Sequence, residues 1–178
     1  MVKDNVLHTF INDLANLYTP YFDVYRNEQL DGLPLSFLAQ YRRRDERYML
    51  SKKIKIYGIE NQQIIFATAC EKAITSNFLK DFYEKIETNL DNYIIKHEEH
   101  MSTIILGMIV TNHDIDQKVL KDAKKFRKIK FLKFGLHGWA EIYLAIVNPK
   151  KKNIIIHSKG KQFVSGVDNF LKGENVAQ

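Results

Sequence analysis

The sequence predicts a single α/β (α+β) domain over residues 1–178, with helices packed on the faces of a mixed central β-sheet. Three observations predict this class. The patterns over residues 62–134 follow the order β-α-β-α-β, which is typical of a sheet with helical connections. Residues 103–111 are apolar on both faces, as expected for a central strand covered on each side. A chain of 178 residues without an internal repeat suits one domain.

The N-terminal part of the chain is expected to form one helix and two strands. Apolar residues recur every three or four positions up to Leu17, which predicts an amphipathic helix. Pro20 ends this helix, because a proline disfavours helix in the residue before it. Residues 20–26 and 35–43 are predicted strands around a turn at Asp31-Gly32.

The middle of the chain is expected to form two strands, a long helix and the central strand. Residues 52–58 alternate lysine with isoleucine, which predicts a half-exposed strand. Glu60-Asn61 is predicted to make the turn into a second strand over residues 62–70. An apolar stripe at helical spacing predicts one helix over residues 75–99, and the central strand at residues 103–111 follows it.

The last third of the chain is expected to add a helix, three strands and a final helix. Asp114 and Gln117 resemble a capping box, so the first of these helices is predicted to begin there. Gly135 and Gly138 predict a turn between two strands. The remaining predicted elements are strands over residues 129–134, 140–148 and 153–157, and a helix that stops near Gly173.

Positive charge is concentrated in one stretch of the chain. Residues 121–161 contain twelve Lys/Arg and two acids, a net charge of +10, whereas the whole chain carries +6 and the remainder therefore −4. Such asymmetry creates a local positive potential that attracts polyanions. Phe126, Phe131 and Phe134 lie among these basic residues and could stack on bases, although Phe126 also fits a core stripe. The candidates for nucleic-acid contact are Lys121, Lys124, Lys125, Arg127, Lys128, Lys130 and Lys133.

A second candidate site is the segment His97-Glu98-Glu99-His100, near the end of the predicted long helix. Histidines at positions i and i+3 share a helix face, and carboxylates beside them could help to hold a divalent metal. A third ligand would come from His113 or His137. The alternative is a solvated helix end, where histidine suits the helix dipole. The metal candidates are His97, Glu98 and His100, and no other cofactor is predicted.

A third candidate is a pocket formed by His137, Trp139 and Glu141 beside the two turn glycines. The alternative is a tight turn whose tryptophan packs in the core. The sequence has no phosphate-binding loop and no serine in a nucleophile-elbow setting. Cys70 is expected to be a small buried residue. No catalytic residue is therefore assigned, and we expect a non-enzymatic domain.

Three segments of the sequence resemble an uncharacterised bacterial or archaeal family of unknown function. These segments are His97–Thr103, Lys133–Glu141 and Arg44–Tyr48, and the resemblance extends over roughly residues 20–162. Because nothing is known of what the family does, the resemblance implies no activity and no site residue.

The predicted order of elements is also similar to the PD-(D/E)xK nuclease-like fold. That fold's chemistry needs an acid and then an acid-x-Lys on neighbouring strands, to hold Mg²⁺ and polarise water. The sequence departs from this signature. Asp116-Gln-Lys118 and Asp122-Ala-Lys124 lie on a predicted helix, and the expected strand carries Ala67-Thr-Ala69, with Glu71-Lys72 only at its end. The resemblance therefore implies a degenerate member of that fold.

Three functions are compatible with these features. The first is a non-enzymatic domain that binds nucleic acid or another polyanion through residues 121–133 and 150–161. The second is a metal-dependent nuclease or phosphodiesterase, which uses the histidine segment or a set around Glu60 and Glu71. The third is an interaction module for an acidic protein.

The sequence also indicates where the protein works. The single cysteine fits a reducing compartment. Residues 1–8 lack the apolar core of a signal peptide, and the longest apolar run, residues 104–110, is too short to span a bilayer. We therefore expect a cytoplasmic protein without a membrane partner. The oligomeric state is left open.

Overall fold

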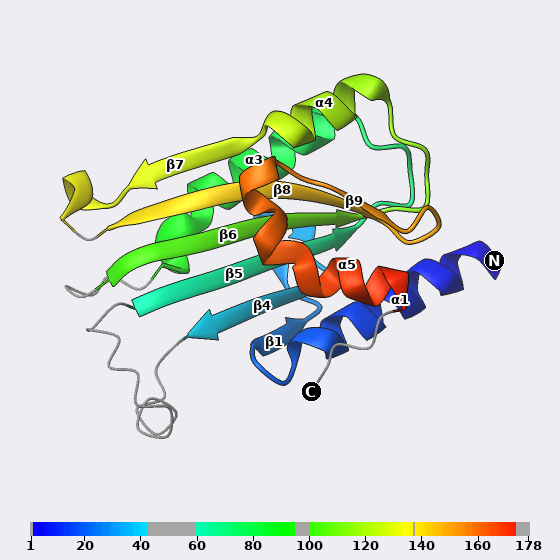
Figure 1. The fold of residues 1–178 in the computed structure, drawn as a ribbon, viewed down its shortest axis with the longest axis horizontal. Coiled ribbons are helices and arrows are strands. Elements are labelled where there is room, and N and C mark those ends of the chain that lie inside the picture. Colours follow the sequence, from blue (N-terminus) through cyan, green and yellow to red (C-terminus); the bar gives the residue numbers. More distant parts are fainter. Residues whose placement is uncertain (1, 43–59, 95–99, 137, 174–178) are drawn as a thin grey trace.

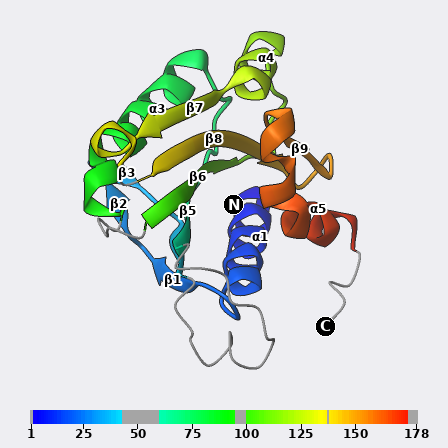
Figure 2. The same cartoon turned by 60° about the vertical axis from the view of Figure 1, so that its left-hand side comes forward.

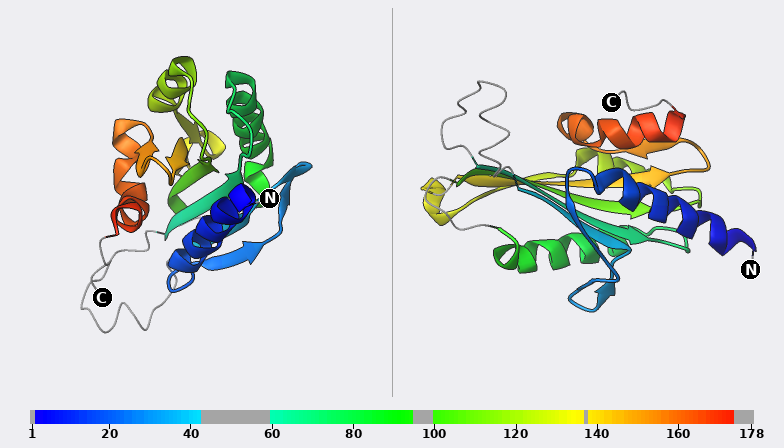
Figure 3. Two further views of the ribbon diagram at one scale, coloured as in Figure 1. Left: turned by 90° about the vertical axis from the view of Figure 1, so that its right-hand side faces the viewer. Right: turned by 90° about the horizontal axis from the view of Figure 1, so that it is seen from below.

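The structure is a computed structural model that describes residues 2–42, 60–94, 100–136 and 138–173. These residues form three layers, in which a seven-stranded mixed sheet lies between two pairs of helices (Figure 1). Figure 2 and Figure 3 show one pair on each face of the sheet. The pairs are α1 (Val2–Tyr18) with α5 (Ser165–Lys172), and α3 (Ser76–Asn89) with α4 (Gln117–Lys125).

The strand order in the sheet is β1-β4-β5-β6-β8-β7, and β9 pairs with the end of β8. The pairs β5–β6 and β6–β8 are parallel, and the other pairs are antiparallel. A separate hairpin joins β2 (Gln29–Leu30) to β3 (Leu33–Pro34). The strands of the sheet are β1 (Asp23–Arg26), β4 (Phe37–Arg42), β5 (Glu60–Ala69), β6 (His100–Val110), β7 (Arg127–Phe131), β8 (Trp139–Asn148) and β9 (Asn153–Ile155).

The core has two halves, one on each face of the sheet. Phe82 and Ile86 of α3 are fully buried against one face, and Leu14 of α1 is fully buried against the other. Gly107 lies in the middle of β6, where an added Cβ would lie 2.8 Å from both Ile86 Cδ1 and Leu144 Cδ2. Since a real Cβ does not approach other atoms so closely, this glycine lets α3 pack directly on the central strand.

The predicted fold class is confirmed: the described residues form one α+β domain with helices on both faces of a mixed sheet. The helix predicted over residues 75–99 is too long, because α3 ends at Asn89 and a 3-10 turn, η1 (Leu90–Asn92), follows. The apolar stripe continues past this turn, since Ile94 is still buried in the same half of the core. Periodicity alone therefore overextended the helix, and His100 begins β6 instead of ending a helix.

The turn predicted at Glu60-Asn61 is wrong. Both residues belong to β5, where they pair in parallel with His100 and Ser102 across an irregularity in the register. The strand predicted over residues 52–58 lies outside the described residues.

The predicted capping box is also wrong. α4 is capped by Asp116, whose Oδ2 accepts a hydrogen bond from the backbone N–H of Lys118 at 3.3 Å. Asp114 instead forms an ion pair with Lys151 at 2.6 Å. Both aspartates precede the same apolar run, so the spacing in the sequence did not distinguish them.

Candidate functional site

The exposed side of α4 carries a row of lysines that we call the basic ridge. Val119 and Ala123 of this helix are buried against the sheet, and the lysines between and beyond them are exposed. A spacing of three or four residues places most of these lysines on neighbouring turns of one helix side. The basic ridge consists of Lys118, Lys121, Lys124 and Lys125. Three of its four members were predicted as nucleic-acid contacts.

The other predicted basic contacts are divided between the two faces of β7. Lys128 faces α3, where its Nζ lies 2.7 Å from Glu87 Oε1 and also donates to the hydroxyl of Tyr83. The hydrogen bond to Glu87 raises the pKa of Lys128. Arg127 lies on the opposite face and pairs with Glu141. Lys128 and Arg127 are therefore already neutralised. Of the rest of the predicted set, the described residues form no ion pair with Lys121, Lys124, Lys125 or Lys130, and the side chain of Lys133 lies outside the described residues.

The three phenylalanines among the basic residues have different surroundings. Phe126 packs edge-on against Tyr83, with 4.7 Å between ring centroids, and belongs to the core, as the structural alternative predicted. Phe131 is 68% exposed at the end of β7. Phe134 is fully exposed and has a left-handed backbone, with φ of 57°, in η2 (Lys133–Gly135). Two aromatic rings therefore lie in solvent, one at the end of β7 and one three residues after it.

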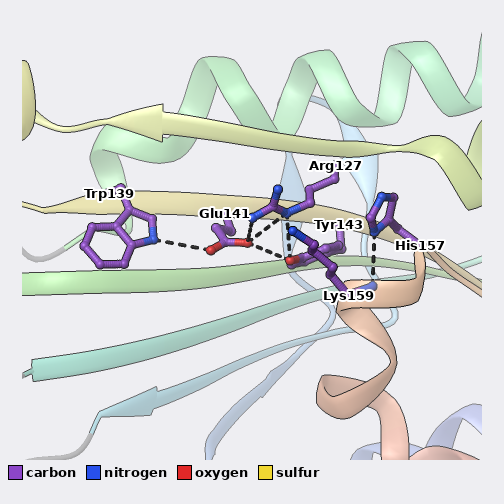
Figure 4. Close-up of polar contacts among 6 residues, drawn as sticks. All are labelled: Arg127, Trp139, Glu141, Tyr143, His157 and Lys159. Atoms are coloured by element: carbon purple, nitrogen blue, oxygen red, sulfur yellow. Dashed lines mark hydrogen bonds and ion pairs between the residues drawn. The ribbon is translucent and has the colours of Figure 1, made fainter.

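The predicted pocket residues Trp139 and Glu141 lie on the same face of β8 (Figure 4). Arg127 places Nη2 3.0 Å and Nε 3.1 Å from Glu141 Oε2, and the hydroxyl of Tyr143 donates to the same oxygen at 2.6 Å. Trp139 Nε1 donates to Oε1 at 3.4 Å. The sequence predicted two members of this cluster, whereas Arg127 and Tyr143 depend on strand pairing. His137 lies outside the described residues.

The charge of Glu141 is held by its partners. Its side chain is 18% exposed and that of Arg127 is 25% exposed. Burial raises the pKa of Glu141, but hydrogen bonds from Tyr143 and Arg127 outweigh burial and keep this pKa below its ordinary value. Because three side chains donate to this carboxylate, it has little capacity to act as a base. The cluster positions Arg127 and Trp139 on the sheet instead.

A second segment with lysines, the 3-10 helix η3 (Ser158–Val164), packs near the Glu141 cluster on the α1/α5 face of the sheet. It packs on Tyr143 so closely that a Cβ on Gly160 would lie 2.8 Å from Tyr143 Cδ1. His157 caps η3 by accepting a hydrogen bond at Nδ1 from the backbone N–H of Lys159, at 3.2 Å (Figure 4). Lys159 is therefore the second residue of the segment that packs on Tyr143.

The predicted metal ligands are not brought together by the described residues. His97 and Glu98 lie outside those residues, and His100 begins β6, so the expected shared helix face is wrong for His100. Glu60 and Glu71 flank the ten-residue strand β5 at its two ends. A strand of that length spans roughly 30 Å, so these two carboxylates cannot share a metal ion. Within the described residues, no group of three potential ligands is close enough to hold one.

The residues compared with the nuclease signature lie where the sequence predicted. Residues 67–69 are in β5, and the hydroxyl of Thr68 donates to the carbonyl of Pro34 at 3.0 Å. Asp116 caps α4 and Asp122 lies within it. Asp122 accepts a hydrogen bond from the hydroxyl of Ser76 at 3.1 Å. These two aspartates therefore do not provide a strand-borne acid-x-Lys site.

A cleft that the sequence did not predict lies at the carboxyl end of β5. Its volume is about 930 Å³, and its lining includes His8 and Arg26 as well as Glu71, which follows the strand. His8 Nε2 lies 3.1 Å from Glu71 Oε1, and His113 Nε2 lies 2.5 Å from the carbonyl oxygen of Glu71. No single stretch of sequence could indicate this cleft, since distant segments build it. Cys70 also lines the cleft and is only partly buried.

Comparison with known proteins gives one match. A family model described as Domain of unknown function (DUF8052) matches residues 7–169, which is most of the chain. The match confirms the resemblance to a family of unknown function. No curated protein and no solved structure matches the chain. In the described residues, no helix combines the length and the apolar character needed to cross a bilayer.

Proposed function

Because the chain belongs to this family of unknown function, its role has to be inferred from its own surface, and we propose that it binds single-stranded nucleic acid along α4 and β7. The phosphates lie along the basic ridge, and unstacked bases contact the aromatic rings beyond it. One observation supports this most directly: Phe131 and Phe134 are exposed at the end of the chain segment that carries the ridge. Sequence-tolerant single-strand binding combines these two elements.

The charges of the ridge support the phosphate part of the proposal. Among the described residues, no ion pair joins any of the four ridge lysines to a carboxylate. Lysines without a carboxylate partner are hydrated and can exchange that water for phosphate. Each phosphate that they neutralise releases counterions from the nucleic acid, so binding becomes steeply dependent on salt.

The exposed rings support the stacking part of the proposal. Phe131 and Ile129 lie on the same face of β7 as Arg127, away from α3 and α4, and Trp139 pairs with Phe131 on β8. Because β7 is an edge strand of the sheet, a bound strand crosses this edge to pass from the basic ridge to these rings. An aromatic ring in this position adds about 1–3 kcal/mol for each base that stacks on it. A duplex hides its bases, so the rings favour a single strand over a duplex of the same length.

Two other functions differ from this proposal in measurable ways. An acidic protein partner would use the same lysines but would not need stacking on Phe131. A metal-dependent nuclease needs a metal site, and the pair of Glu60 and Glu71 cannot form one across β5. We therefore favour nucleic-acid binding without cleavage over nuclease activity.

The test is fluorescence anisotropy with labelled single-stranded DNA and RNA, in about 50–200 mM salt, since phosphate contacts weaken steeply over that range. We expect micromolar binding at low salt that falls as salt rises. The double variant Lys121→Glu/Lys125→Glu is expected to lose binding, and Phe131→Ala to weaken it about 5-fold or more, as expected for the loss of one stacked base.

The control compares one charge reversal in each of the two helical layers. Lys121→Glu changes the basic ridge, and Lys172→Glu changes an exposed lysine of α5 on the other face of the sheet. Only the first is expected to weaken binding. Absence of binding at low salt, or equal loss in both variants, would contradict the proposal. Binding that depends on Lys121 but not on Phe131, together with equal binding of polyglutamate, would favour the acidic partner instead.

A further inference from the structure

The cleft at the carboxyl end of β5 has the position and size of a small-molecule site. In open sheets with parallel strands, ligands bind at the carboxyl ends of the strands. β5 runs parallel to β6, the end of β5 lines this cleft, and the volume of about 930 Å³ lies within the usual range for ligand pockets. The cleft is separate from the basic ridge, because α1, β1 and the loop before α3 line it.

Arg26 gives the cleft an oriented positive charge. Its Nη1 donates to Asn12 Oδ1 at 2.9 Å, and its Nη2 donates to Asn16 Oδ1 at 2.7 Å. Both acceptors are neutral amides, so they fix the guanidinium without cancelling its charge. A guanidinium has five N–H donors in a planar fork, and two bonds leave donors for an incoming oxyanion.

Two further features favour an anion at the same place. Lys72 lines the cleft and is exposed, so it can reach a bound ligand. The cleft also includes Thr75, the N-cap of α3, and the first turn of that helix contains no acidic residue. The start of a helix carries a partial positive charge that adds to the potential of the two cations.

The cleft also has an apolar part. Ile11 and Leu35 are buried core residues that line it, and Phe78, which is partly buried, lines it too. A ligand that met only the charged groups would leave this surface in contact with water. We propose that the cleft binds a small molecule that carries a phosphate or carboxylate group on an apolar body.

Substitution of Glu71 is expected to change the affinity for an anion in the opposite direction to substitution of Arg26. Its carboxylate lines the cleft and pairs with His8 at 3.1 Å. A negative charge near the oxyanion opposes binding, so its removal strengthens binding, whereas removal of Arg26 weakens it. A change in folding alone would not move the affinity in opposite directions in the two variants.

The test uses phenyl phosphate and 3-phenylpropionate as probes and phenol as the neutral control, with saturation-transfer NMR and calorimetry on the full chain. Both anions are expected to bind at low salt, and phenol at least tenfold more weakly. Arg26→Gln is expected to lower the affinity of the anions at least tenfold, and Glu71→Gln to raise it severalfold. The better of the two anions identifies whether phosphate or carboxylate is preferred.

A conservative variant and the ridge variants complete the test. Arg26→Lys keeps the charge but loses the fork, so its affinity is expected to lie between those of the wild type and Arg26→Gln. Lys121→Glu is expected to leave probe binding unchanged, which separates this site from the nucleic-acid surface. The proposal is overturned if neither anion binds, if phenol binds equally well, or if Arg26→Gln binds as the wild type does.

Discussion

At the scale of single residues, Glu141 connects three neighbouring side chains. It lies on β8 and holds Arg127 of the neighbouring strand through two contacts to one oxygen. Tyr143, two residues further along β8, donates to that same oxygen. The carboxylate therefore links the edge strand to the central sheet by charge as well as by backbone pairing. Its loss removes the carboxylate acceptor of the partly buried Arg127 and of the buried Tyr143.

This position predicts a specific dependence of stability on pH. The pKa of Glu141 is lower in the folded protein than its ordinary value. The ionised carboxylate therefore contributes stability that is complete above the ordinary glutamate pKa and is lost as the pH falls through the lower pKa of the folded state. Glu141→Gln is expected to destabilise the protein at neutral pH by about 1–3 kcal/mol and to flatten this acid limb.

Urea unfolding between neutral pH and pH 3 measures both effects. The control is Glu84→Gln, which removes an exposed carboxylate that pairs with Lys80, at 3.7 Å, one turn earlier on α3. That variant is expected to change stability little. An acid limb that is identical in Glu141→Gln and the wild type would contradict this role.

At the scale of elements, the start of α4 depends on Asp116 and not on Asp114. The side chain of Asp116 satisfies a backbone N–H that the first turn of a helix leaves without a partner. Asp116→Ala is therefore expected to cost about 1 kcal/mol of unfolding free energy, whereas Asp114→Ala loses only an exposed ion pair and costs less. Chemical denaturation of both variants gives the comparison. A larger loss in Asp114→Ala would support the capping box inferred from spacing.

Local patterns in the sequence predicted most helices and strands, and they failed where tertiary packing determines the boundary of an element. Apolar runs and apolar stripes predicted β6, β8 and the buried sides of α3 and α4, because buried positions are occupied mainly by apolar residues. The end of α3 was misplaced because the apolar stripe continues through η1. The turn at residues 60–61 was misplaced because the polar residues there belong to the beginning of β5.

The candidate site was predictable only in part for a related reason. Clustering of charge in the sequence located the basic ridge, since α4 is one continuous segment. The sequence could not show that Arg127 meets Glu141, because that contact depends on the register in which Arg127 pairs with Tyr143. The cleft around Arg26 was not predicted, since it needs side chains from α1, β1 and the loop after β5 in one place.

At the scale of the whole molecule, the sheet joins two halves of the core that are expected to unfold together. Leu14 of α1 and Leu79 of α3 are buried in different halves. Leu14→Ala and Leu79→Ala are each expected to cost about 2–5 kcal/mol. Because one sheet contributes to both halves, each variant is expected to shift the whole transition.

Two probes measure this cooperativity. Trp139 is the one tryptophan of the chain and lies on β8, so its fluorescence reports on the sheet, and far-ultraviolet circular dichroism reports on the helices. In both variants the two urea transitions are expected to coincide. A helical signal lost before the fluorescence changes would show that the layers unfold separately.

The order of strands also has a consequence for how the nascent chain acquires its structure. β7 is synthesised before β8 but lies outside it, because β8 occupies the place between β6 and β7. A ribosome therefore exposes β6 and β7 with a gap between them until Asn148 has emerged. Only then can the sheet close, and η3 and α5 cover it afterwards. A growing chain that stalls before this point leaves the apolar strand β6 without its neighbour β8, and such exposed apolar strands favour aggregation unless a chaperone covers them.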